Sequence, residues 1–250
     1  MELYYRFPVF ILGISLLLCL ISYLEDGEFS KFWSVASNVA YVAPVLIAYY
    51  NRQKTWLFVY FFSLVIVFST GYHLCYAYED NACLVINYDN WGHTDVLFSW
   101  LLLYTLICYV VFKNEYTDIT LLTNVVIVVV TLEAGCRAAN FDCQSSKIIL
   151  AFVYVLILLY RMITEEYYKL LHLRDAAFAL ISIGVATIFY FNGPENFPSH
   201  SLWHVLGAVG GCLALTIYKD SKLHTLGFQI KKTNRVKEEA QRLLARKELF

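Results

Sequence analysis

The sequence predicts an all-α polytopic membrane protein, and two features of its composition carry that prediction. Of the 250 residues, 59% are hydrophobic and only 16% are charged. A soluble domain carries about 25% charged and about 45–50% apolar residues. A soluble fold of this size has too little interior to hide so much apolar surface, whereas a bilayer accepts it. The composition therefore argues against a soluble enzyme, a disordered chain and a nucleic-acid-binding protein.

Eight stretches have the length and apolar character of membrane-spanning helices, for which about 20 residues are needed. Helices are expected because lipid offers no hydrogen-bond partner to an open sheet edge. The stretches are residues 7–23, 32–50, 55–77, 91–112, 119–135, 148–164, 176–192 and 200–218. Their connections are short, so neighbouring helices are expected to run antiparallel.

The basic residues orient these stretches, because loops on the cytoplasmic side carry an excess of Lys and Arg. With a cytoplasmic N-terminus and eight spans, only Lys31, Arg137 and Lys147 fall in outside loops. The other 16 of the 19 basic residues then lie on the cytoplasmic side. We therefore expect an integral protein of the plasma membrane or the secretory pathway (ER or Golgi), with a cytoplasmic C-terminus.

The chain divides into three parts. Residues 1–31 form an N-terminal hydrophobic segment, which is either an extra span or a signal peptide, although no small-residue cleavage site follows it. Residues 32–218 form a bundle of seven helices. Residues 219–250 form a tail with nine basic and four acidic residues, which is expected to be an amphipathic helix, either lying on anionic lipid or solvated.

Two pairs of cysteines lie in short loops on the predicted outside, where the redox environment permits disulfides. They are Cys75 with Cys83, and Cys136 with Cys143. We expect both pairs to be bridged, with reduced thiols as the alternative. The other three cysteines lie in apolar runs and are expected to be packing residues.

Polar side chains inside the predicted spans are few, and five of them share one depth near the outside. Such groups are costly in a membrane, so each needs a reason. Ser69 and His73 are one helical turn apart at the end of the third stretch, and Asp95 is near the start of the fourth. His200 and His204 are one turn apart at the start of the last stretch. Topology thus predicts one site made from three helices.

The three histidines of this site predict a zinc ion. Histidines four residues apart place two imidazoles on one side of a helix, a common arrangement of metal ligands. Three histidine ligands with an open fourth position are typical of catalytic zinc. His73, His200 and His204 are therefore the predicted ligands, and Asp95 is expected to orient the metal-bound water or accept its proton. The alternative is a set of unrelated wet or capped histidines, as is expected for His93.

The pattern Ser69-xxx-His73, then Asp95, then His200-xxx-His204 across a seven-helix core resembles the CREST superfamily. That superfamily includes alkaline ceramidases, adiponectin and progestin receptors, and the transmembrane-protein-eight and myomaker family. The resemblance covers the second to the eighth stretch. The closing segment from His200 to His204 is most similar to the transmembrane-protein-eight and myomaker branch.

The resemblance implies a zinc centre that acts on, or holds, a membrane lipid. In the ceramidases and related lipases, such a centre hydrolyses an amide or an ester, with Asp95 and Ser69 here as the catalytic residues. The presence of Asp95 favours an enzyme, since the myomaker branch lacks this carboxylate. The alternative is a myomaker-like membrane-remodelling or cell-fusion protein with structural zinc and no catalysis. A receptor is a weaker reading, a homodimer is left open, and no nucleic-acid partner is expected.

Overall fold

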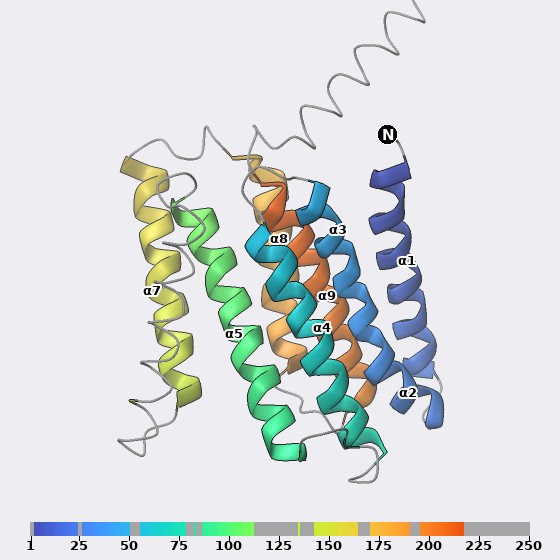
Figure 1. Cartoon of the computed structure of the whole chain (residues 1–250). Coiled ribbons are helices and arrows are strands. Elements are labelled where there is room, and N and C mark those ends of the chain that lie inside the picture. Colours follow the sequence, from blue (N-terminus) through green and yellow to red (C-terminus); the bar gives the residue numbers. More distant parts are fainter. Residues whose placement is uncertain are drawn as a thin grey trace, which may run out of the picture.

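The computed structural model describes residues 3–24, 27–50, 56–78, 83, 87–112, 135, 143–164, 171–190 and 196–217. Among these residues the regular elements are all helices, and none is a strand (Figure 1). The helices are α1 (Leu3–Leu24), α2 (Glu28–Ala36), the 3₁₀ helix η1 (Ser37–Tyr41), α3 (Val42–Tyr50), α4 (Trp56–Ala77), α5 (Tyr88–Phe112), α7 (Cys143–Thr164), α8 (Leu173–Tyr190) and α9 (Phe197–Leu215).

Five helical segments are long and apolar enough to cross a membrane, which confirms the all-helical, membrane-embedded class. They are Phe7–Leu24, Glu28–Tyr50, Trp56–Ala77, Tyr88–Val111 and Leu173–Tyr190. The predicted span 119–135, apart from Gly135, and the predicted tail 219–250 lie outside the described residues. The seven-helix count and the cytoplasmic side of the tail therefore remain predictions.

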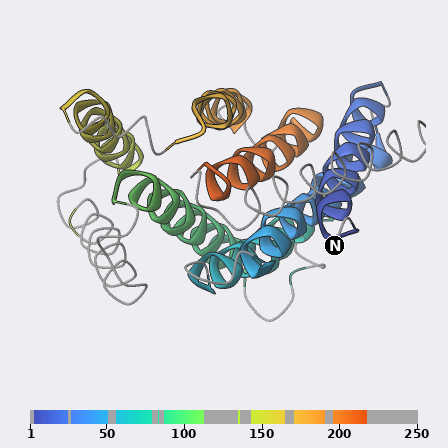
Figure 2. The same ribbon diagram turned by 90° about the horizontal axis from the view of Figure 1, so that it is seen from above.

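Helix α9 lies in the middle of the bundle (Figure 2). It packs along α8 on one side and against α1, α2, η1 and α3 on the other, and it also contacts α5. Helices α4 and α5 form an antiparallel pair, and α7 packs against α5 at the edge of the bundle. Any side chain on the inner faces of α9 is therefore shielded by several helices.

Glycines let the neighbours of α9 come close to its backbone. A Cβ on Gly210 would lie 2.5 Å from Cγ1 of Ile183 on α8. A Cβ on Gly211 would lie 2.8 Å from Cζ of Phe62 on α4. Carbon atoms in ordinary contact are about 3.5–4.0 Å apart, so these approaches require the absence of a side chain. Small residues serve this purpose at helix interfaces in membranes.

The second predicted span is not one continuous α-helix, and this differs from the expectation for residues 32–50. It consists of α2, η1 and α3 in succession. Pro44 explains the break, because a proline inside a helix has no N–H and its ring clashes with the carbonyl four residues earlier. That carbonyl belongs to Ala40, within η1. The tighter 3₁₀ turn is a common response to such a conflict.

Helix α1 is joined to the bundle by buried polar contacts. Trp33 donates its indole N–H to Sγ of Cys19, at 3.2 Å. The hydroxyl of Ser30 donates to the backbone carbonyl of Ser22, at 2.8 Å. Large apolar side chains cover the opposite side of α1 and remain exposed, as expected for a surface that faces lipid. These contacts join α1 to α2 in the interior of the bundle.

Candidate metal centre

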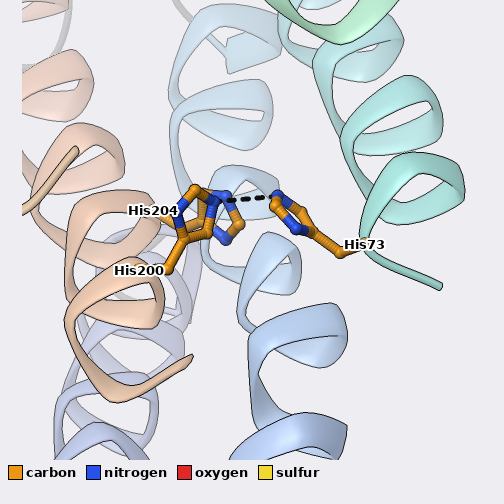
Figure 3. A group of neighbouring side chains, drawn as sticks. All are labelled: His73, His200 and His204. Carbon is orange, nitrogen blue, oxygen red and sulfur yellow. Dashed lines mark hydrogen bonds between the residues drawn. The ribbon is translucent and has the colours of Figure 1, made fainter. Parts of the chain in front are cut away.

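Three histidine side chains meet at one end of the bundle, from two helices (Figure 3). His73 lies in the second-last turn of α4, and His200 and His204 lie in successive turns at the start of α9. The start of α9 is fixed by Asn196, whose side-chain oxygen accepts the backbone N–H of Ser199 at 3.2 Å. Such an N-cap satisfies an otherwise unpaired donor of the first turn. The two α9 histidines are thus held on one side of a well-capped helix.

The three imidazoles are close enough to share one ion. Their potential ligand nitrogens all lie within 4.8 Å of one another. The Nε2 atoms of His73 and His200 are 2.9 Å apart. The side chains are shielded from solvent, with exposures of 2% for His73, 5% for His200 and 2% for His204. The prediction that these histidines form one group is therefore confirmed, and the group could bind a metal ion.

The donor set fits zinc. Zinc binds imidazole nitrogens at about 2.0–2.1 Å in a tetrahedral arrangement, which separates neighbouring nitrogens by about 3.3–3.4 Å. The 2.9 Å between Nε2 of His73 and Nε2 of His200 must widen by a few tenths of an ångström, and the widest separation in the group, up to 4.8 Å, must shorten by up to about 1.4 Å. Three histidines also leave a fourth position for water or substrate, as catalytic zinc sites do.

Ser69 and Asp95 lie beside the histidines, on α4 and α5. The Oγ atom of Ser69 is 3.5 Å from Nε2 of His204, and the Ser69 side chain also lies near the Asp95 carboxylate. The Oδ1 atom of Asp95 is shielded from solvent and has no hydrogen-bond partner among the described residues. A shielded carboxylate oxygen without a donor is costly, which indicates that a donor or a cation belongs next to it.

Ser37 and Ser34 are two participants that the sequence prediction missed. Ser37 is fully buried, and its Oγ lies 2.8 Å from Nδ1 of His204. The same hydroxyl donates to the backbone carbonyl of Ser34, at 3.0 Å. A signal for these residues is present, since Ser30, Ser34 and Ser37 are spaced four and three apart, and so share one helical face. All three are buried, at 1% exposure or less.

A cavity of about 370 Å³ opens beside the histidine group. Asp95, Ser99 and His200 line its polar end, and its walls are mostly aromatic and aliphatic side chains of α4, α5, α8 and α9. On α5 the lining runs from Asp95 to Leu106, a rise of about 16 Å at 1.5 Å per residue. The volume is within the range of about 300–1,000 Å³ that is usual for small-molecule sites.

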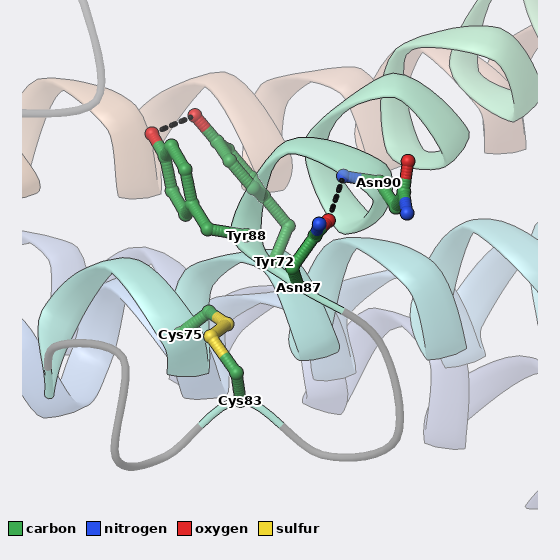
Figure 4. The surroundings of a disulfide bond; sticks show 6 residues. All are labelled: Tyr72, Cys75, Cys83, Asn87, Tyr88 and Asn90. Carbon is green, nitrogen blue, oxygen red and sulfur yellow. Dashed lines mark hydrogen bonds between the residues drawn. A yellow bond between two sulfur atoms is a disulfide. The ribbon is translucent and has the colours of Figure 1, made fainter.

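The connection from α4 to α5 is held by a disulfide and a pair of tyrosines (Figure 4). Cys75 and Cys83 are bonded, which confirms one of the two predicted bridges. The hydroxyls of Tyr72 and Tyr88 are 3.0 Å apart, and the side-chain oxygen of Asn87 accepts the N–H of Asn90 at the start of α5. These contacts tie the end of α4, with His73, to the start of α5, with Asp95.

The other features predicted from the sequence either lie apart from the histidine group or fall outside the described residues. The side chain of His93 is exposed and is not part of the histidine group. The second predicted disulfide, between Cys136 and Cys143, rests on side chains outside the described part of the chain. The three other cysteines are free and buried, as expected for packing residues.

Fold and site together define the class: an integral membrane protein with a buried three-histidine group at one end of its helices. The sequence profile of the family described as "Protein of unknown function (DUF3522)" matches residues 29–205. That match covers well over half of the chain and includes all three histidines, so the chain belongs to this family. No curated protein and no solved structure matches the chain.

Proposed function

We propose that the protein is a zinc-dependent hydrolase that cleaves an amide or an ester bond in a membrane lipid. The observation that carries this proposal is Asp95, which lines the same cavity as His200 and whose Oδ1 is shielded from solvent. A purely structural metal site needs no neighbouring carboxylate or cavity. The resemblance to the CREST superfamily, through the same five residues, points to the same chemistry.

His73, His200 and His204 would hold the zinc ion. When bound, zinc lowers the pKa of a coordinated water toward about 7 and polarises a carbonyl oxygen. Asp95 is the general base of the proposal, because its free oxygen can take a proton from water or substrate. Ser69 lies beside that carboxylate and would help to orient it. A hydrogen-bonded base held in one orientation is more effective than a freely rotating one.

The cavity supports a substrate with a long apolar part. Its polar groups gather at the histidine end, while the walls farther along α5, such as Leu102, Leu103 and Leu106, are aliphatic. A lipid would place its scissile carbonyl near Asp95 and its chain along these walls. In this proposal the site faces the extracellular or lumenal leaflet, because the basic residues assign the opposite end of the helices to the cytoplasm.

The first test is zinc content. The protein purified in detergent should contain one zinc per chain by mass spectrometry, and His204→Ala should lose it because only two imidazole ligands remain. His93→Ala is the matched control, since His93 is exposed and apart from the group. A purified wild-type protein without zinc, even after zinc is added, would refute the proposal.

The second test separates catalysis from a structural role of zinc. Asp95→Asn should keep zinc and lose release of fatty acid from ceramide (an amide) or from phospholipid (an ester) in mixed micelles. A loss of roughly 100- to 10,000-fold is expected for removal of a general base. Asp89→Asn is the control, because Asp89 is an exposed carboxylate on the same helix. Unchanged membrane-remodelling or cell-fusion activity of zinc-loaded Asp95→Asn in cells would instead favour the membrane-remodelling alternative.

A further inference from the structure

The 3₁₀ helix η1 brings a second layer of side chains to the histidine group. Ser37 is its first residue and Tyr41 its last. Both are buried, and Tyr41 also packs where α9 carries Gly207, since a Cβ there would lie 2.8 Å from the tyrosine oxygen. The break caused by Pro44 therefore places η1 directly against the part of α9 that carries His204.

The hydrogen bonds of Ser37 fix the direction of its contact with His204. A serine hydroxyl has one proton to donate and two lone pairs to accept with. The carbonyl of Ser34 can only accept, so the Ser37 proton is committed to it. The 2.8 Å contact with His204 is then one in which Nδ1–H donates to Oγ. With its proton on Nδ1, the neutral imidazole presents a lone pair on Nε2.

That lone pair points toward the rest of the group. Nε2 of His204 is the nitrogen that approaches Ser69, and the His204 ring lies 4.8 Å from the His73 ring and 4.7 Å from the His200 ring, between centroids. A histidine that binds a metal through one nitrogen usually donates its other N–H to an acceptor, which fixes tautomer and ring orientation. Here Nδ1–H of His204 donates to the Ser37 hydroxyl, and that hydroxyl in turn donates to the Ser34 carbonyl.

We propose that Ser37 is a positioning residue of the metal centre: it holds the proton on Nδ1 of His204 and so keeps Nε2 available as a ligand. The inference rests on the metal binding of the proposed function but not on its hydrolytic step. Loss of a partner of this kind typically weakens metal binding by about 10- to 100-fold.

The test is the zinc affinity of the full-length protein in detergent, measured by competition with a chelator of known affinity. Ser37→Ala should bind zinc about 10- to 100-fold more weakly than wild type. Ser34→Ala is the matched control: its hydroxyl donates to the Lys31 carbonyl, away from the histidines, and the substitution keeps the backbone carbonyl that Ser37 needs. Its zinc affinity should match that of wild type.

A second pair of variants removes the hydroxyl without changing the shape. The Thr and Val side chains in Ser37→Thr and Ser37→Val have the same shape and differ only in that one carries a hydroxyl where the other carries a methyl group. Any packing strain is therefore the same in both variants. The threonine variant should bind zinc more tightly than the valine variant by about 10-fold or more. Thermal transitions of all variants with zinc removed serve as the second readout, and there Ser37→Ala should be less stable than Ser34→Ala, since it also leaves the buried Nδ1–H of His204 without an acceptor.

Equal zinc affinity of wild type and Ser37→Ala, or of the threonine and valine variants, would overturn the inference and leave the zinc centre intact. A wild-type protein that binds zinc but hydrolyses no lipid would overturn only the proposed reaction. A wild-type protein that binds no zinc would overturn both.

Discussion

The close approach of α4 and α5 at Gly71 allows a quantitative prediction for the substitution Gly71→Ala. A Cβ at this position would lie 2.5 Å from Cζ3, 2.6 Å from Cε3 and 2.8 Å from Cη2 of Trp91. All three atoms belong to one rigid indole, which also packs on Phe68, with 5.8 Å between ring centroids. The ring therefore cannot yield by a simple rotation of its far end.

The magnitude follows from those distances. Contacting carbons need about 3.5–4.0 Å, so the helices must separate by about 1 Å. Overpacking of this kind costs about 1–3 kcal/mol. For a chain of this length, each kcal/mol corresponds to about 2–4 °C in the unfolding temperature. We therefore expect the transition of Gly71→Ala to fall by about 2–12 °C.

The same displacement should reach the proposed catalytic carboxylate. Asp95 follows Trp91 by one helical turn on α5, and its partner Ser69 is on α4. Moving α5 outward should carry Asp95 away from Ser69, while the three histidines, on α4 and α9, stay together. A misplacement of about 1 Å can reduce a rate by about 100-fold. Gly71→Ala should thus retain zinc and lose most lipid hydrolysis.

The assay can use the buried thiols of the protein itself. Cys19, Cys108 and Cys212 are free and buried, so a thiol-reactive dye reports their exposure on heating. Gly184→Ala on α8 is the control, because a Cβ there meets nothing within 4 Å. That variant should be as stable as wild type or slightly more so, since alanine is the better helix former. If both variants unfold at the same temperature, the steric argument is wrong.

Three further substitutions test other contacts by the same thermal assay. Cys75→Ser removes the disulfide to Cys83 that closes a short loop, and it should lower the free energy of unfolding by about 2–3 kcal/mol. Under reducing conditions the wild type lacks the disulfide too, so the difference between the two proteins must disappear. Tyr23→Phe removes a 3.0 Å hydrogen bond to Ser199 and should cost about 1 kcal/mol; no change would mean that α1 is not held to α9 by this contact. Gly211→Ala places a Cβ 2.8 Å from a phenyl carbon and should cost about 1–3 kcal/mol, whereas a neutral result would show that α4 and α9 can separate freely.

The histidine group was predictable from the sequence for a simple physical reason. Spacing of four residues puts His200 and His204 on one helix side, and alternation of helix direction brings His73 to the same depth. Both arguments need only the approximate ends of the helices. They do not say which helices are neighbours, and for that reason the contact between Ser69 and Asp95 could be anticipated only as shared depth.

The second layer around the histidines was not predictable in the same way. The contact of Ser37 with His204 joins residues 167 apart in the sequence, and it depends on η1 being a 3₁₀ turn. Pro44 signals a break nearby, but its position does not tell which side chain will turn inward. The spacing of Ser30, Ser34 and Ser37 marks a polar helix face, and only the packing of α2 and η1 on α9 gives that face a role.

The polarity of α9 has a consequence for how the protein reaches its membrane. This helix is not one of the five segments whose length and composition alone suit a membrane span, because its first turns carry two histidines and two further buried serines, Ser199 and Ser201. Such groups enter lipid at a cost unless partners already shield them. Helix α9 is also the last described helix to be synthesised, so α1, η1, α3 and α8 are available to receive it. We therefore expect the entry of α9 into the membrane to depend on the helices that receive it, and a defect in those helices should appear as failure of α9 to insert.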